Sequence, residues 1–194
     1  MITDINQLDL TKQYTYADYS TWMFKDRVEL LKGWLHRMSP APLDRHQQIV
    51  TGIMGELLPF FKRRPCQVRT APYDVRLPDS RKSTADNTIF TVVQPDLCII
   101  CDPAKIDRRG CIGAPDWIIE ILSPGNSKTE MQTKYELYQE AGVLEYWIVQ
   151  PEHESVLVFA LQNAHFQLVK MYTGTDAIPS VLFPELHIRL EEVF

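Results

Sequence analysis

The sequence predicts a mixed α+β fold, in which helices flank a central mixed β-sheet and a hairpin lies near each end of the chain. Ile49, Ile53 and Leu57 belong to a broad apolar stripe in residues 43–63, which predicts one long amphipathic helix. Continuous apolar runs such as residues 117–123 are typical of strands buried on both faces. With 194 residues, the chain is most simply one domain, residues 1–194.

The first half of the chain begins with a short helix at residues 15–24, capped by Thr15. Residues 28–38 predict the N-terminal hairpin, because Lys32-Gly33 suits a tight turn between two strands. Pro59 should kink or end the long helix, because proline cannot donate the helical hydrogen bond. Further strands are predicted at residues 67–70, 73–77 and 92–101, followed by a loop at residues 102–113.

The second half alternates a helix with strands. A strand at residues 117–123 precedes a helix at residues 127–141, whose start is marked by the capping box of Ser127 and Glu130. A strand follows at residues 144–149. The C-terminal hairpin is predicted from residues 155–161 and 165–172.

The composition, with 45% apolar and 23% charged residues, is that of an ordinary globular protein. No apolar run approaches the ~18 residues of a membrane span, and the first residues have no secretory-signal pattern. We therefore expect a cytoplasmic protein without a membrane partner. Cys98 and Cys101 lie three apart in a predicted strand and face opposite sides, so the four cysteines are expected to be core or surface thiols and not metal ligands.

The net charge of −5 argues mildly against a nucleic-acid partner, but its distribution is uneven. Residues 62–82 hold seven basic and two acidic side chains, a net +5, which leaves −10 for the rest of the chain. A basic stripe of this kind would suit a phosphate substrate if it lay beside a group of acidic metal-binding residues. The simpler interpretation is a solvated face.

Two charges fall where apolar residues are expected. Glu120 sits in a strand with bulky apolar neighbours on both faces, and Lys134 falls between Leu137 and Tyr138 on the inward face of the next helix. A buried carboxylate is usually paired or bound to metal. A structural ion pair between Glu120 and Lys134 is the alternative to a catalytic role for both.

Asp96 follows Pro95 in a strand that is a natural antiparallel neighbour of the Glu120 strand. Pro-Asp pairs are also common turn chemistry. Opposed carboxylates on paired strands repel one another unless a cation lies between them, and oxygen ligands favour Mg²⁺ or Mn²⁺. Asp96 and Glu120 are thus the predicted metal ligands, and Lys134 would orient the attacking water or stabilise charge on the phosphate.

This arrangement resembles the PD-(D/E)XK nuclease superfamily and, more closely, the Uma-type family of restriction-endonuclease-like proteins. The resemblance spans residues 28 to about 150. Its motifs are VELLKG (28–33), MSPAP (38–42) with His46, PYDVR (72–76), QPDL (94–97), GAPDWIIEILSP (113–124), KYELYQEAGV (134–143) and EYW (145–147). It implies a restriction-endonuclease-like fold and a divalent-metal nuclease site.

The chain departs from this pattern at three positions. Leu122 stands where the superfamily has its lysine, so the resemblance implies that Lys134 supplies that charge from the helix. Glu130 and Gln150 both stand where the family usually has Asp.

Three other residues fall on the family motifs and are supporting candidates. Glu29 is either a further metal ligand or a surface carboxylate, and His46 is either a base or a satisfied core histidine. Asp74 either shapes the site or pairs with Arg76.

Three functions remain open on the sequence. The first, which we favour, is a Mg²⁺-dependent endonuclease that hydrolyses DNA. A homodimer would suit this function, because cutting both strands takes two sites. The second is a catalytically inactive nucleic-acid- or protein-binding domain on the same scaffold. The third is a structural homodimer that uses an apolar surface including Trp147 and the terminal hairpin.

Overall fold

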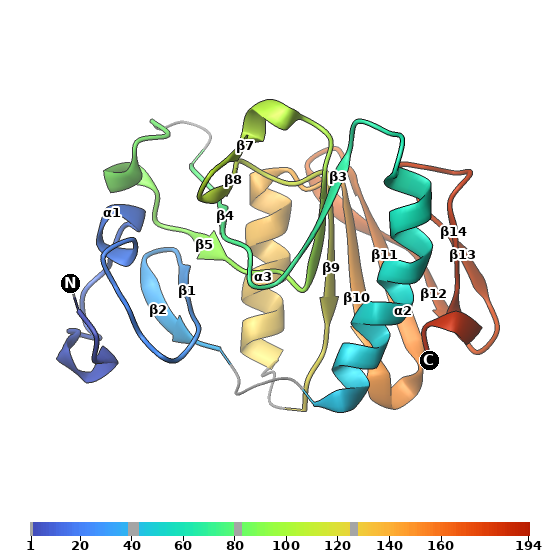
Figure 1. Ribbon diagram of the computed structural model, residues 1–194, viewed down its shortest axis with the longest axis horizontal. Helices are drawn as coiled ribbons and strands as arrows, with labels where there is room; N and C mark the ends of the chain where they lie inside the picture. Colours follow the sequence, from blue (N-terminus) through green and yellow to red (C-terminus); the bar gives the residue numbers. More distant parts are fainter. Residues whose placement is uncertain (1, 39–42, 80–82, 125–127) are drawn as a thin grey trace.

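Two six-stranded β-sheets form the framework of the protein in the computed structural model, which describes residues 2–38, 43–79, 83–124 and 128–194 (Figure 1). The larger sheet has the order β12-β11-β10-β9-β6-β3, and only β9 and β10 run parallel. Its strands are β3 (Gln67–Thr70), β6 (Leu97–Ile100), β9 (Trp117–Ile121), β10 (Glu145–Gln150), β11 (Ser155–Gln162) and β12 (His165–Thr173).

The smaller sheet has the order β2-β1-β5-β4-β8-β7, with β4 and β8 parallel. Its strands are β1 (Val28–Leu31), β2 (Trp34–Arg37), β4 (Val75–Arg76), β5 (Val92–Val93), β7 (Ile106–Asp107) and β8 (Gly110–Ile112). A two-stranded sheet pairs β13 (Ala177–Pro179) with β14 (His187–Arg189). The short 3-10 helices are Ile5–Gln7, Asp86–Thr88, Pro103–Lys105, Pro151–His153 and Leu190–Glu192.

Helices α2 (Asp44–Phe61) and α3 (Lys128–Ala141) cover opposite faces of the larger sheet (Figure 1). Ile49, Ile53 and Leu57 recur every four residues on α2 and are buried in the same cluster as Trp117 and Ile119 of β9. On the other face, Leu137 and Tyr138 of α3 share a cluster with Ile118. Strand β9 is therefore covered on both faces, as its apolar run predicts.

The mixed fold with its two hairpins is confirmed. Strands β1 and β2 pair as predicted, and the turn between them has positive φ at both Lys32 (53°) and Gly33 (87°), which suits a two-residue hairpin turn. Strands β11 and β12 form the C-terminal hairpin. The predicted helix at residues 15–24 is shorter, α1 (Tyr16–Tyr19), although Thr15 and Asp18 do form a capping box.

Two predicted elements are wrong. Residues 92–101 do not form one strand, because the chain leaves the smaller sheet after β5 and joins the larger sheet at β6. Pro95, which has no N–H for a strand ladder, lies in the crossing. Residues 102–113 contain β7 and β8 and are not all loop, since Ile106 pairs with Cys111.

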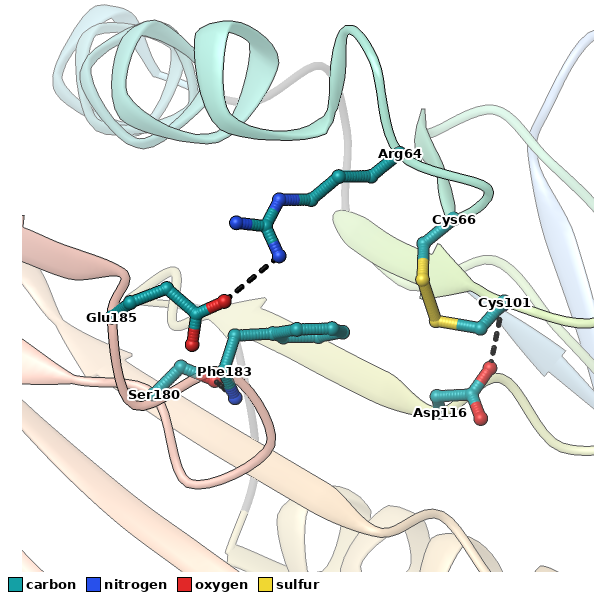
Figure 2. Close-up of a disulfide and its surroundings, with 7 residues drawn as sticks. All are labelled: Arg64, Cys66, Cys101, Asp116, Ser180, Phe183 and Glu185. Carbon is teal, nitrogen blue, oxygen red and sulfur yellow. Dashed lines mark hydrogen bonds and ion pairs between the residues drawn. A yellow bond between two sulfur atoms is a disulfide. The ribbon is translucent and has the colours of Figure 1, made fainter.

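The cysteine prediction is also wrong in part. Cys66 and Cys101 form a disulfide that links β3 to the end of β6, which Figure 2 shows beside the Arg64–Glu185 ion pair. The register Gln67↔Ile100 places the two cysteines opposite one another, and a single sequence gives no register. Cys98 and Cys111 are buried thiols, as expected.

The structure also differs from two expectations about the protein surface. Among the described basic residues of 62–82, Arg76 does not contribute to an exposed stripe, because it is buried against Asp107 (Nη2–Oδ1 2.7 Å). Arg64 pairs with Glu185. Trp147 is 1% exposed, so its predicted place on a dimer surface is wrong. No helix in the described ranges is long and apolar enough to cross a lipid bilayer. Residues 39–42 of one family motif and Ser127 of the predicted capping box lie outside the described residues.

Candidate functional site

Glu120 lies in β9 on the face covered by α3, as the strand alternation predicts. Lys134 donates from Nζ to Glu120 Oε1 at 3.1 Å, and Tyr138 donates from its hydroxyl to the same oxygen at 2.6 Å. The two donors are four residues apart, which places them on one face of α3. Within the described chain, the side-chain donors to Glu120 both contact Oε1.

Asp96 immediately precedes β6, which pairs antiparallel with β9. The register Leu97↔Ile119 continues to place Asp96 opposite Glu120, as predicted. Asp96 Oδ2 accepts a hydrogen bond from the Ile121 backbone N–H at 2.8 Å. His46 Nε2 lies 3.2 Å from the same oxygen.

Glu29 connects the smaller sheet to this site. It comes from β1, is fully buried, and its Oε1 lies 3.1 Å from Lys134 Nζ. The same oxygen accepts the Gln94 backbone N–H at 2.7 Å. Oε2 of Glu29 is buried without a partner in the described chain. The interpretation of Glu29 as a surface carboxylate is therefore wrong, and Lys134 is held between two carboxylates from different sheets.

His46 and Asp74 take different places. His46 is buried on α2 and contacts Asp96, so it combines a core position with a contact to the site. Asp74 accepts hydrogen bonds from Gln94 Nε2 (2.8 Å) and Tyr19 Oη (3.2 Å). Among the residues that the structure describes, Gln94 links Asp74 to Glu29 of the site. The predicted pairing of Asp74 with Arg76 is not seen, because Arg76 pairs with Asp107.

The charges of the site perturb one another strongly. Burial raises the pKa of Glu120 to about 7; the negative charges of Asp96 and Glu29 add to this, and Lys134 opposes it. Burial works against the Lys134 ammonium, but Glu120 and Glu29 outweigh it and raise its pKa. Burial likewise opposes the charged form of His46, yet the hydrogen bond with Asp96 leaves its pKa raised. Lys134 therefore stays protonated and is unsuited to act as a base.

The donor set fits a hard divalent cation. Three carboxylates face one lysine and one histidine, and the protein donors described above occupy one oxygen each of Asp96, Glu120 and Glu29. The second oxygen of each carboxylate accepts none of these bonds, and Oε2 of Glu29 is buried without a hydrogen-bond partner in the described chain. The described residues contain no cluster of three or more potential ligands in metal-binding geometry. One or two carboxylates are enough to hold a hard divalent cation when waters and substrate phosphate complete its ligands.

Sequence reasoning missed two residues of the site. The helical pattern predicts only an apolar role for Tyr138, but its hydroxyl donates a hydrogen bond to Glu120. The spacing of four residues between Tyr138 and Lys134 is the signal in the sequence for this contact. Gln94 donates its N–H to Glu29 and its side-chain amide to Asp74, and it precedes the Pro95-Asp96 pair. The bond to Glu29 depends on the pairing of β1 with β5, and the bond to Asp74 depends on the pairing of β4 with β5.

A cavity of about 500 Å³ opens on the His46 side of the site. It lies between the start of α2 and the segments that follow the parallel strands β9 and β10. Its lining residues are Leu43, Arg45, His46, Leu122, Ser123, Pro124, Gln150, Pro151, Glu152 and His153.

Comparisons with known proteins agree with this architecture. The structure is similar to a crystal structure described as a "putative nuclease belonging to DUF820" from Anabaena variabilis, with a TM-score of 0.72 at 20% identity. The match covers 93% of this chain and 97% of that one, and at this identity it shows a shared fold. No curated protein matches the sequence significantly. The sequence model of the Uma2 family, described as "Putative restriction endonuclease", matches residues 16–191, and the chain therefore belongs to this family.

Proposed function

We propose that the protein is a Mg²⁺- or Mn²⁺-dependent endonuclease that hydrolyses phosphodiester bonds in DNA. The observation that carries this proposal is the convergence of Asp96, Glu120 and Lys134 at one end of the β6–β9 pair. Membership of a restriction-endonuclease family supports a nuclease as the general class. Asp96 and Glu120 would hold the ion, which when bound lowers the pKa of a coordinated water and neutralises charge on the phosphate.

The protein's own residues prepare the site for this chemistry. Lys134 and Tyr138 fix Oε1 of Glu120, and the Ile121 N–H and His46 fix Oδ2 of Asp96. Each carboxylate is thus oriented through one oxygen and keeps the other for a ligand. The permanent positive charge of Lys134 lowers the repulsion between the carboxylates and favours negative charge that develops on the phosphate.

The test is cleavage of DNA by purified protein with Mg²⁺ or Mn²⁺. Asp96→Ala and the isosteric Asp96→Asn should both lose metal-dependent nicking of a supercoiled plasmid. Asp176→Asn alters a partly exposed carboxylate that accepts the Thr173 N–H and lies 3.7 Å from Lys170, and this variant should cut like the wild type. Equal metal-dependent activity in the wild type and in folded Asp96→Asn would overturn the proposal.

A non-catalytic nucleic-acid- or protein-binding domain is the second candidate. The observation that favours it is that Lys134 already bonds to two buried carboxylates, as a purely structural ion cluster would. For DNA, it predicts salt-dependent binding with no cleavage in either metal. A folded wild-type protein that binds DNA without cutting it would select this candidate over the first.

A further inference from the structure

We propose that the cavity beside His46 is a subsite for one unpaired nucleobase of the nucleic-acid substrate, next to the phosphate that reaches Asp96. This inference rests on the proposed function for the identity of the substrate. The cavity volume of about 500 Å³ lies within the range of small-ligand sites. His46 belongs to both places, because it lines the cavity and contacts Asp96 at 3.2 Å.

The walls of the cavity suit a flat, largely apolar group. Leu43 stands at the start of α2 with 63% of its surface exposed, Leu122 and Pro124 follow β9, and Pro151 follows β10. An exposed leucine that faces a cavity gives an apolar surface on which a base can lie. A base has a flat, largely apolar face that can pack against such a wall.

The charged residues at the rim do not make a phosphate site. Arg45 donates to Glu154 at 2.8 Å and to the Phe194 carbonyl at 2.7 Å, so its charge is already committed. Glu152 adds a negative charge to the same lining. A neutral base is therefore the better occupant than a second phosphate.

Gln150 supplies a polar group that can read a base edge. Its Oε1 accepts the Ser155 hydroxyl at 2.9 Å, while its amide N–H₂ makes no hydrogen bond in the described chain. An amide donor in an apolar cavity matches the ring nitrogens and carbonyl oxygens of a base. A base in this place is unstacked, so the subsite favours single-stranded or locally open DNA.

Removing the base provides the test. The probe is a short single-stranded oligodeoxynucleotide, compared with versions that carry an abasic position at each site in turn, and binding is measured by anisotropy in Ca²⁺. In the wild type, one abasic position should weaken binding roughly tenfold. In Leu43→Ser the same abasic position should have less than a twofold effect, because the wall that holds the base is gone. Serine is favourable at a helix N-cap, so this variant should fold.

Leu58→Ser is the matched control. Leu58 lies on the same helix, is 50% exposed and does not line the cavity, so this variant should keep the wild-type response to the abasic position. Gln150→Leu should reduce discrimination between bases at that position while binding is retained. The subsite is overturned if no abasic position weakens wild-type binding, if Leu43→Ser responds like the wild type, or if the oligonucleotide does not bind.

Cleavage is measured separately in Mg²⁺, so the two proposals can fail independently. If an abasic position weakens binding but no cleavage occurs, the subsite is supported and the endonuclease proposal is overturned. If cleavage occurs but no abasic position weakens binding, the endonuclease proposal is supported and the subsite is overturned.

Discussion

The buried carboxylate of Glu120 should make the stability of the metal-free protein fall as the pH rises. The folded protein raises the pKa of this group from its ordinary value of 4.5 to about 7. Below pH 4.5 both the folded and the unfolded states hold the proton. Between the two values the unfolded chain releases it and the folded chain keeps it, so unfolding becomes easier.

The magnitude follows from the size of the shift. A difference of about 2.5 pH units at 1.36 kcal/mol per unit corresponds to about 3 kcal/mol of unfolding free energy. The group is 9% exposed, so solvent screening reduces this figure only slightly. Glu120→Gln cannot titrate and should lack this component, because its amide stays neutral over the whole range and its carbonyl oxygen can still accept the bonds from Lys134 and Tyr138.

The assay is urea unfolding from pH 4 to pH 8 in the presence of a chelator. The wild type should lose about 3 kcal/mol more than Glu120→Gln over this range. Glu140→Gln, which changes an exposed carboxylate on α3, serves as the control and should follow the wild type. Parallel pH profiles for the wild type and Glu120→Gln would refute the assignment of a raised pKa to this buried group.

Three further predictions use the same network and its surroundings. Lys134→Met should destabilise the metal-free protein by about 3–5 kcal/mol, because it leaves two buried carboxylates without their cation. Millimolar Mg²⁺ should recover part of the loss in melting temperature. A variant as stable as the wild type would contradict this prediction. His46→Gln should lower the affinity for Mn²⁺ measured by calorimetry while the fold is kept, because the contact that orients Asp96 is altered; unchanged affinity would exclude a positioning role. Glu145→Ala should lower the free energy of unfolding in urea by about 3 kcal/mol. The Glu145 carboxylate accepts hydrogen bonds from the Trp147 indole, the Ser180 hydroxyl and the backbone N–H groups of residues 181 and 182. Ser180→Ala removes only one of these donors and should lower the free energy of unfolding much less.

The sequence predicts the position of a site residue correctly where the periodicity of a single helix or strand determines its burial. The buried position of Lys134 followed from the helical period, and the face of Glu120 followed from the alternation along its strand. The antiparallel pairing of the Asp96 and Glu120 strands was also predicted correctly. These inferences need only local geometry and one pairing between neighbouring apolar segments.

The rest depended on contacts between distant parts of the chain. Nothing near Glu29 in the sequence indicates that β1 packs against α3, so its burial could not be predicted. The Cys66–Cys101 bond needed the register of β3 against β6. The division of residues 92–101 between two sheets was missed because an apolar run looks the same whether it continues in one sheet or crosses to another.

The ion cluster around Lys134 also determines the order in which the protein can assemble. Strand β1 leaves the ribosome long before α3, yet Glu29 has no cation until Lys134 arrives. The smaller sheet therefore cannot reach its final packing during early synthesis, when it would bury a lone negative charge. Chains truncated before α3 should lack the final packing of β1, and the candidate site should form only after α3 has been synthesised.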